Sequence, residues 1–392
     1  MKLRMSERNL LVISNSFPNK DNTFVGDIFV KEQIKYLRHY FDNVYVISPV
    51  AYGMERLRKT KHFDYQFDNV KVFFPKYTNY PLFWYYGRSS WVGLEASAIM
   101  SLIKKENLHF DLIHAHFTWP SGAVAVKLKK SLGVPVVITE HTHETLYKAL
   151  REGNPYYINT WRECDAIIRV NKKDVPLICR CGVDPSKVYA IANGYDPGKY
   201  YPVDKKEARQ SLDLPVDLKI VLNISRLYKE KGQKYLISAI NDIVKDRDDI
   251  FCYIGGTGPL KNDLEQQITS LNLQEYVKLA GFIPDEQINL WMNACDLFVL
   301  PSLSESFGIA QLEALACGKP VVATRNGGSE EIIISDEYGL LVEPEDPEEL
   351  AEKILVALDR EWDREVILAY VERFTWENIG KEIVSMYSRV LG

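Results

Sequence analysis

Two glutamates, Glu305 and Glu313, flank Gly308 in the segment PSLSESFGIAQLEAL. The apolar run at 297–300 precedes them and predicts a buried strand that leads into a turn and a helix. The turn and the helix start would present free backbone N–H groups to an anion. Glu313 could then reach ribose hydroxyls from the helix, and Glu305 could bind sugar hydroxyls from the loop. Two solvated glutamates beside a helix N-terminus would fit the same spacing, so both interpretations stay open.

Two cations, Arg226 and Lys231, follow the apolar run at 219–224 and stand ahead of a helix expected at 234–245. Arginine offers a planar fork and lysine a point charge, and together they suit a diphosphate. An ordinary basic loop is the alternative. Because this half of the chain is acidic, a local cation pair at a strand end favours an anionic ligand.

Glycines follow two other predicted strands. In the turn GGTGP at 255–259, glycines such as Gly258 would let a ligand or another backbone approach closely. This turn lacks the full spacing of a dinucleotide-binding loop, and its proline simply suits a helix start. Gly26 begins a predicted helix after the first strand. Neither turn identifies a ligand by itself.

Histidines also gather at strand ends. His114 and His116 lie two residues apart on a predicted strand, and His141 follows the next one. Residues two apart on a strand share a face, so a metal is geometrically allowed. No third ligand stands at a recognisable spacing, and we therefore expect no metal. A single histidine, His116, facing a cleft and binding a substrate hydroxyl or phosphate fits the sequence better.

An aromatic segment spans residues 77–91, with basic residues nearby that include Arg88. Its rings are those of Tyr77, Tyr80, Phe83, Trp84, Tyr85, Tyr86 and Trp91. Amphipathic aromatics beside cations suit a membrane interface. A loop that packs its own rings over the domain, or one that grips a sugar acceptor, would have the same composition.

Charge is shared unequally along the 392 residues, whose net charge is −5. Residues 1–200 carry 28 Lys and Arg against 19 Asp and Glu, whereas residues 201–392 carry 20 against 34. The length predicts two domains. The charge asymmetry indicates that the two domains have different partners, and an anionic membrane or an anionic substrate would suit the basic one. No zinc-finger spacing or arginine-rich tract supports nucleic acid binding.

The cysteines and the apolar runs indicate a cellular setting. Six scattered cysteines show neither metal-site nor secreted-disulfide spacing, which favours a reducing cytosol. No apolar run reaches about 18 residues, so we expect no transmembrane helix, and the N-terminal apolar run is too short for a signal peptide. If the protein works at a membrane, we expect it on the surface.

Short apolar runs alternate with amphipathic segments throughout, including helices expected at 90–106 and 121–132. This alternation predicts a parallel sheet covered on both faces, and it restarts after residue 200. We therefore expect an α/β protein with two doubly wound domains, 1–200 and 201–373, that face each other across a cleft. The amphipathic C-terminal segment 374–392 would return to the first domain.

The ordered set of these motifs resembles the retaining family 4 glycosyltransferases of the GT-B architecture, nearly end to end. The resemblance rests on the Gly26 loop, His114-Ala-His116, Glu140-His141, Asn193-Gly194, Ser225-Arg226 with Lys231-Gly232, Gly256-Thr-Gly258-Pro259, Gly281-Phe282, Glu305 to Gly308 with Glu313, Gly327-Gly328 with Glu331, and Gly339 to Val342. It implies two Rossmann-like domains, the first on the acceptor side and the second binding a nucleotide-diphosphate sugar as substrate, with no cofactor.

The resemblance also implies roles for single residues. Arg226 and Lys231 would hold the donor diphosphate, Glu313 the ribose and Glu305 the donor sugar, with His116 beside the transferred sugar. Further donor contacts would come from Gly26, Asn193, Gly258, Phe282 and the segment Phe307, Gly308, Ile309 and Ala310. The acceptor or a membrane would meet Tyr80, Trp84, Tyr85, Tyr86, Arg88, Trp91 and His141.

The sequence departs from the family pattern in two places. Gly26 stands alone after Val25 where the family often has two glycines, so the ligand contact of this loop is open. Glu330 stands where the family often has proline, so the turn there could differ. Neither position touches the residues expected to hold the diphosphate.

Four functions compete at this stage. The leading hypothesis is hexose transfer from a nucleotide sugar to a lipid-linked or membrane glycan acceptor, in the cytoplasm, with peripheral attachment to the inner face of the cell membrane as an option. A transferase with a soluble sugar-phosphate or small-metabolite acceptor is the first alternative. A nucleotide-sugar 2-epimerase shares the architecture, and a non-catalytic sugar-binding scaffold is the third alternative. The cation and carboxylate positions argue against these last two.

Overall fold

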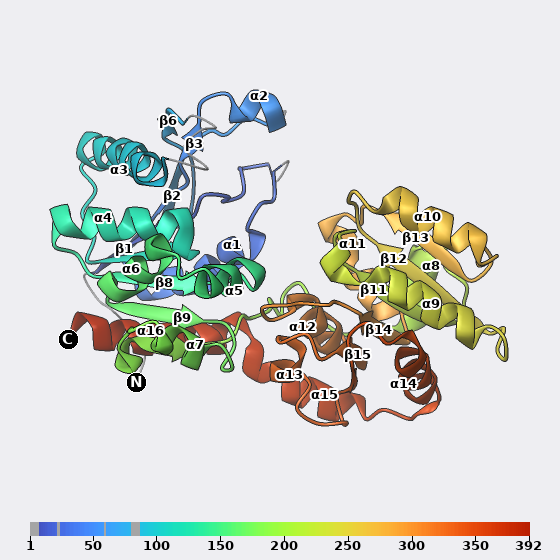
Figure 1. Ribbon diagram of the computed structural model, residues 1–392. Coiled ribbons are helices and arrows are strands. Elements are labelled where there is room, and N and C mark those ends of the chain that lie inside the picture. The colour runs from blue at the N-terminus through green and yellow to red at the C-terminus, as the bar shows by residue number, and fades with distance from the viewer. Residues whose placement is uncertain (1–7, 22–23, 59, 80–86) are drawn as a thin grey trace. The chain divides into compact units, whose positions relative to one another are not determined.

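The computed structural model describes residues 8–21, 24–58, 60–79 and 87–392. The chain divides into two compact units (Figure 1). Unit 1 comprises Met1–Ala192 with Trp376–Gly392, and unit 2 comprises Asn193–Thr375. Unit 2 thus begins before the expected boundary at residue 201. The reason is that Tyr195 pairs with the end of the same unit, where its N–H donates to the Phe374 carbonyl at 3.0 Å.

Unit 1 is built on an eight-stranded sheet in the order β10-β9-β8-β7-β1-β2-β5-β4. All its neighbouring strands are parallel except β4 and β5. The strands are β1 (Asn9–Ile13), β2 (Asn43–Ile47), β4 (Tyr65–Phe67), β5 (Val70–Phe73), β7 (Leu112–His116), β8 (Val136–Glu140), β9 (Ala166–Arg169) and β10 (Val188–Ala190), and a separate pair is formed by β3 (Val50–Ala51) and β6 (Lys76–Tyr77). The central strands are buried along most of their length, as expected for a sheet covered on both faces.

The helices of unit 1 are α1 (Ile28–Leu37), α2 (Met54–Arg58), α3 (Arg88–Lys105), α4 (Ala123–Leu132), α5 (Glu144–Arg151), α6 (Pro155–Glu163), α7 (Val175–Arg180) and α16 (Trp376–Leu391). The helix expected at 121–132 begins at Ala123 because Thr118–Gly122 forms a separate wide turn. The closing helix α16 belongs to unit 1 and packs against α1. Its buried Tyr387 hydroxyl lies 2.6 Å from Nδ1 of His114 on β7, which fixes the helix on the sheet.

Unit 2 has a six-stranded parallel sheet in the order β13-β12-β11-β14-β15-β16. Its strands are β11 (Lys219–Ile224), β12 (Ile250–Gly255), β13 (Val277–Gly281), β14 (Leu297–Leu300), β15 (Val321–Thr324) and β16 (Gly339–Val342). Its helices are α8 (Lys205–Ser211), α9 (Gln233–Ile243), α10 (Lys261–Ser270), α11 (Asp285–Ala294), α12 (Ile309–Ala316), α13 (Ser329–Ile332), α14 (Pro347–Asp359) and α15 (Arg364–Val371). Both units are therefore doubly wound, as the alternating pattern predicted.

The strand order of unit 2 decides where its ligand site can form. Strands β11 and β14 are neighbours although β12 and β13 lie between them in the sequence. The strand order reverses at this point, and ligands of doubly wound sheets bind beyond the carboxyl ends of the strands there. The loops that leave these two ends carry the predicted cations and the predicted glutamate.

Candidate active site

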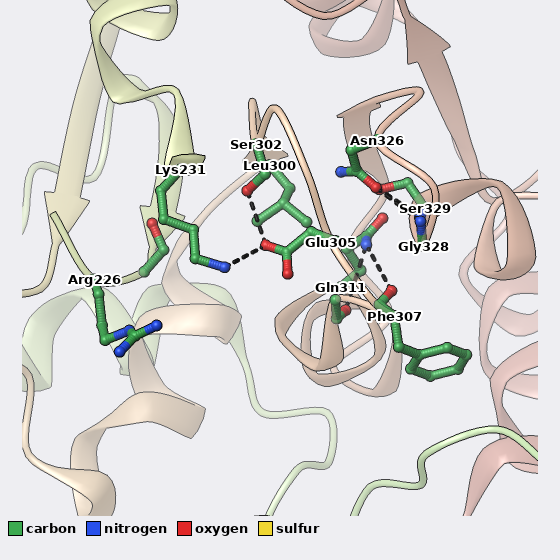
Figure 2. Close-up of polar contacts among 12 residues, drawn as sticks. Arg226, Lys231, Leu300, Ser302, Glu305, Phe307, Gln311, Asn326, Gly328 and Ser329 are labelled. Carbon is green, nitrogen blue, oxygen red and sulfur yellow. Dashed lines mark hydrogen bonds and ion pairs between the residues drawn. The ribbon is translucent and has the colours of Figure 1, made fainter. Parts of the chain in front are cut away.

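An ion pair joins the two loops at the strand-order reversal of unit 2. Lys231 Nζ lies 2.6 Å from Glu305 Oε1, and the two side chains are 16% and 13% exposed (Figure 2). The hydroxyl of Ser302 donates to the same oxygen at 2.9 Å. Both bonds end on Oε1, which leaves Oε2 outside this pair. Two residues nominated separately from the sequence thus form one charged centre.

Close packing of two loops delivers Lys231 to this position. Gly232 has φ +67°, and a Cβ there would lie 1.9 Å from the carbonyl oxygen of Pro301. Only glycine lets the backbone after β11 approach the backbone after β14 this closely. The N–H of Leu303 donates to the Glu230 carbonyl at 2.8 Å and ties the same two loops. The ion pair is therefore set by the backbone around it.

Arg226 supplies a second cation from the same loop. Its side chain is exposed, and its guanidinium lies 4.9 Å from the ring centre of Tyr228. Within the described residues it makes no ion pair, so its charge is available to a ligand. Figure 2 shows the Arg226 and Lys231 side chains on the same side of Glu305. An anion bound here would meet one free cation and one cation already oriented by a carboxylate.

The helix α12 begins beside this centre. Gly308 at its N-terminus has φ +84°, and no side chain caps the helix there. Glu313 lies on α12 and is hydrogen-bonded to the hydroxyl of Tyr200. Burial, and then the charge and hydrogen bond of Glu313, raise the pKa of Tyr200 far above its ordinary value. Tyr200 therefore stays protonated and holds the Glu313 carboxylate in place.

Asn326 connects the glutamate loop to the turn at Gly327 and Gly328. Its side-chain oxygen accepts from the N–H groups of Gly328 and Ser329 at 3.0 Å each, and its carbonyl accepts from Glu305 N–H at 3.1 Å. The sequence analysis missed Asn326, although an asparagine before two glycines is a turn signal. At the departure from the family pattern, the Glu330 carboxylate accepts from Gly327 N–H at 2.8 Å and closes the turn.

The other predicted donor residues of unit 2 divide by exposure. Phe307 is 2% exposed and packs edge-on against Phe374, so only its backbone could meet a ligand. Ile309 and Ala310 are half-buried in the first turn of α12. Asn193 is 6% exposed, whereas Phe282 is 69% exposed at the end of β13 and available to a flat ring.

Two predicted glycine contacts have another explanation. A Cβ on Gly258 would lie 2.3 Å from the Leu227 carbonyl oxygen, and one on Gly26 would lie 1.9 Å from the Ser16 carbonyl oxygen. Both glycines are therefore required by the neighbouring backbone, whether or not a ligand binds. The sequence alone does not distinguish a glycine required by backbone packing from one required for ligand access. It does not show which backbone segment lies against each glycine.

In unit 1, the two predicted histidines form a stacked pair. His116 Nδ1 lies 3.0 Å from His141 Nε2. Burial is the largest cause that lowers the pKa of His116 well below its ordinary value, and the neighbouring histidines lower it further. Both rings are therefore neutral, and His116 Nε2 and His141 Nδ1 have no hydrogen-bond partner in the described residues. Whichever ring donates, one of these outer nitrogens is a donor and the other an acceptor.

The role of His116 beside a substrate group stays a prediction, to which the structure adds His141 as its hydrogen-bond partner. His116 is 1% exposed, and the ring centre of His114 lies 4.4 Å from that of His116 in a tilted arrangement. Glu140 fixes the loops around the pair, because its carboxylate accepts from the backbone N–H groups of Thr118 and Thr142 at 3.0 and 2.7 Å. Across the described ranges, no three His, Cys, Asp or Glu side chains are placed to hold a metal ion.

The predicted aromatic segment is only partly covered by the structure. Tyr80, Trp84, Tyr85 and Tyr86 lie outside the described residues. Trp91 does not project outward as a surface anchor would, because its indole N–H lies 3.0 Å from the Tyr77 hydroxyl and 3.1 Å from a Glu95 oxygen. Arg88 lies over the rings of Trp119 and Tyr156 at 5.8 and 5.9 Å. In the described part of the chain, no helix is long and apolar enough to span a bilayer.

Comparisons with known proteins identify the class that this fold and site define. The model "Glycosyltransferase Family 4" matches residues 28–199, and the model "Glycosyl transferases group 1" matches residues 204–373. The chain belongs to the family 4 glycosyltransferases of the GT-B architecture. It is an enzyme of the glycosyltransferase class.

Individual relatives support the same assignment. An uncharacterised glycosyltransferase of Methanocaldococcus jannaschii is 31% identical over 71% of this chain and 75% of its own length. D-inositol 3-phosphate glycosyltransferase 2 of Catenulispora acidiphila is 29% identical over 74% of each chain. The structure of Anabaena HepE with UDP and glucose superposes with a TM-score of 0.74 over 97% of this chain and 100% of HepE, at 23% identity, which shows a shared fold.

Proposed function

We propose that this enzyme transfers a hexose from a nucleoside-diphosphate sugar to an acceptor hydroxyl with retention of anomeric configuration and without a metal. The Lys231–Glu305 ion pair beside Arg226 is the observation that carries the proposal. Arg226 and the remaining N–H groups of Lys231 bind the diphosphate, Glu305 Oε2 takes donor-sugar hydroxyls, and Glu313 takes the ribose. The backbone at the start of α12 adds N–H donors for the same anion.

The proposed chemistry follows from where charge develops. The bond between the sugar C1 and the diphosphate oxygen breaks, and the acceptor oxygen bonds to C1 on the same face. The acceptor proton passes to the departing phosphate oxygen. Arg226 and Lys231 stabilise the negative charge that develops on the phosphate, a role that a metal ion has in other enzymes. Glu305 is a positioning residue in this scheme, because no covalent bond to the sugar is needed.

We propose a uridine diphosphate sugar as the first donor to test, because the structure of HepE, a protein of the same fold, contains UDP. For the acceptor, the names of the inositol phosphate glycosyltransferases support a small hydroxylated molecule. A lipid-linked or membrane glycan acceptor at the inner face of the cell membrane is the second candidate, and the basic excess of residues 1–200 favours it.

A donor screen tests the proposal. The full chain is incubated in EDTA with UDP-glucose, UDP-galactose, UDP-N-acetylglucosamine and GDP-mannose, and thermal shift and nucleotide release are measured. We expect binding and slow release with one nucleotide class and no requirement for a divalent cation. With an acceptor present, the anomeric proton coupling in the NMR spectrum of the product reports retention. Binding that appears only with added Mg²⁺ or Mn²⁺ contradicts the metal-free site.

Control variants separate the site from general damage. Lys231→Ala and Glu305→Gln remove the ion pair, whereas Lys278→Ala removes an exposed cation on the same unit. We expect activity to be lost in the first two variants and kept in the third. Equal activity in all three would remove the basis of the proposal. Anionic vesicles containing phosphatidylglycerol, compared with neutral vesicles in a sedimentation assay, test the membrane candidate.

A further inference from the structure

Unit 1 contains a cavity of about 340 Å³ that the proposed donor chemistry does not use. It lies beyond the carboxyl ends of β1 and β2, and its lining includes Tyr77 of β6, Asn79 and Trp91 of α3. Its described lining also includes Asn15, Ser16 and His62. The volume is enough for one sugar ring or cyclic polyol.

The described lining contains no lysine, arginine, aspartate or glutamate. Aromatic rings face amide and hydroxyl groups, a combination that suits ring faces and hydroxyls of an uncharged carbohydrate. Two basic groups of this region pair with one carboxylate: Lys76 Nζ lies 2.7 Å from Glu55 Oε1, and Nδ1 of the lining residue His62 lies 3.2 Å from the same oxygen. A phosphate in this cavity would lack a cation from any described lining residue.

The start of helix α1, near the cavity, is also unsuited to a phosphate. Asp27 occupies the N-cap position of α1, and its carboxyl lies 3.2 Å from the Ser14 hydroxyl. The Asp27 side chain makes no capping hydrogen bond to the helix, but when ionised it repels a second anion at this end of α1. The described charges around the cavity therefore favour a neutral ligand over an anionic one.

Glu95 of α3 lies directly behind the lining and is fully buried. Its Oε1 accepts from Asn15 Nδ2 at 2.8 Å, and its Oε2 accepts from Trp91 Nε1 at 3.1 Å. The Tyr77 hydroxyl is hydrogen-bonded to the same carboxyl and lies 3.0 Å from Trp91 Nε1. One buried group therefore orients an amide, a phenol and an indole that line the cavity.

The network extends to the segment after β7 that contains Trp119 and Ser121. The hydroxyl of Ser121 donates to Asn15 Oδ1, so both ends of the Asn15 amide are fixed. The ring of Trp119 meets Trp91 edge-on at 5.9 Å and holds the indole from outside the cavity. A group of side chains oriented before the ligand arrives loses little freedom when the ligand binds.

We propose that this cavity binds an uncharged, hydroxyl-rich ring of the acceptor and that Glu95 is the positioning residue that orients Asn15, Tyr77 and Trp91 toward it. The inference rests on the proposed transferase function and narrows its acceptor to a neutral polyol or glycoside. It distinguishes this enzyme from relatives whose names specify an inositol phosphate. Trp91, expected from the sequence at a membrane or acceptor surface, takes the acceptor role.

Matched ligand pairs test the chemical class. Binding of myo-inositol against myo-inositol 3-phosphate, and of methyl α-glucoside against glucose 6-phosphate, is measured by calorimetry on the full chain saturated with UDP. We expect the neutral member of at least one pair to bind about tenfold or more tightly than its phosphorylated partner. Tighter binding of the phosphorylated member in both pairs, or no binding of either neutral ring, overturns the proposal.

Variants test the positioning role. Glu95→Gln should raise KM for the neutral acceptor about tenfold while kcat changes less than threefold, and Tyr77→Phe should raise KM in the same direction while keeping the ring. Glu106→Gln is the matched control, because Glu106 is an exposed carboxylate at the end of the same helix. Unchanged KM in both test variants contradicts the role of Glu95, and Tyr77→Phe decides the outcome if Glu95→Gln does not fold.

The donor site provides an independent readout. UDP affinity should be the same in the wild type, Glu95→Gln and Glu106→Gln. Loss of UDP binding by the wild type itself would show that the proposed donor function has failed. Intact UDP binding without any neutral ligand would show that only the acceptor inference has failed.

Discussion

Each unit contains a carboxyl group at the centre of a polar network, and the two groups differ in burial and in the charge of their partners. In unit 2, Glu305 is paired with the lysine cation of Lys231 in a partly exposed loop. In unit 1, Glu95 is fully buried, and its hydrogen-bond partners among the described residues are the neutral donors Asn15, Tyr77 and Trp91. The first arrangement leaves charge near the surface for a charged ligand. The second places a carboxyl group, whose pKa burial raises to about 7, behind a neutral lining. The two proposals therefore assign recognition of a diphosphate and recognition of a neutral ring to separate units, each with the electrostatic setting that suits its ligand.

The largest effect should come from breaking the ion pair of unit 2. Lys231→Ala and Glu305→Gln should each lower kcat by about a hundredfold to a thousandfold, because each removes preorganised charge from the reacting centre. The double variant should be hardly worse than either single one, because the two residues act as a unit. Steady-state kinetics with a saturating donor measures this. Additive losses would mean that the two side chains act separately and that the pair is incidental.

Arg226 should have the next largest effect, on donor binding. Arg226→Ala removes the cation without an ion-pair partner in the described residues, and a charge-assisted contact to phosphate contributes about 1.5–3 kcal/mol. We therefore expect UDP to bind about tenfold to a hundredfold more weakly in calorimetry. Arg226→Lys should recover only part of the affinity, because lysine lacks the bidentate fork. Full affinity in Arg226→Ala would remove this residue from the donor site.

The neutral setting of Glu95 should give unit 1 a pH-dependent stability. Burial is the main cause that raises the pKa of Glu95 from 4.5 to about 7, against the lowering effect of its three hydrogen bonds. Its stabilising contribution is complete below about pH 4.5 and is lost as the pH rises through 7, because the folded state binds the proton more tightly. The loss is about 3 kcal/mol at most.

Glu95→Gln should remove this dependence, since the amide does not titrate. Calorimetric melting should show the variant more stable than the wild type at pH 8 and little different at pH 5. Asp27, whose pKa burial also raises to about 7, still titrates in both proteins and leaves a pH dependence that the two proteins share. Glu106→Gln should keep the wild-type slope. Identical pH slopes in Glu95→Gln and the wild type would contradict the neutral state of Glu95.

The sequence predicted the doubly wound units, and it singled out the two loops of the proposed donor site, because periodicity and strand-end position are local signals. It nominated Lys231 and Glu305 singly. Their pairing depends on β11 and β14 being neighbours, and on the glycine that lets the loops meet, neither of which a single segment encodes. The stacking of His116 on His141 likewise depends on the register of β7 and β8.

Glu95 was missed although the sequence contained its signal. It falls on the same helical stripe as the buried Val92, Ala96, Ile99 and Ile103 of α3. A charged residue on an apolar stripe is rarely buried without partners, so it marks a polar network. What the sequence could not supply was the identity of those partners, since Asn15 and Tyr77 come from segments far from α3.

The smallest expected effect concerns Tyr200, which links the donor carboxylate Glu313 to the interior of unit 2. Tyr200→Phe keeps the buried ring and removes only the hydroxyl that orients Glu313. A hydrogen bond to a charged group contributes about 1.5–3 kcal/mol, but Glu313 remains able to bind a ribose from a less ordered position, so we expect UDP affinity to fall only about threefold to tenfold. Glu313→Ala should lower it further. A Tyr200→Phe variant as weak as Glu313→Ala would mean that the orientation of the carboxylate, more than its presence, determines nucleotide binding.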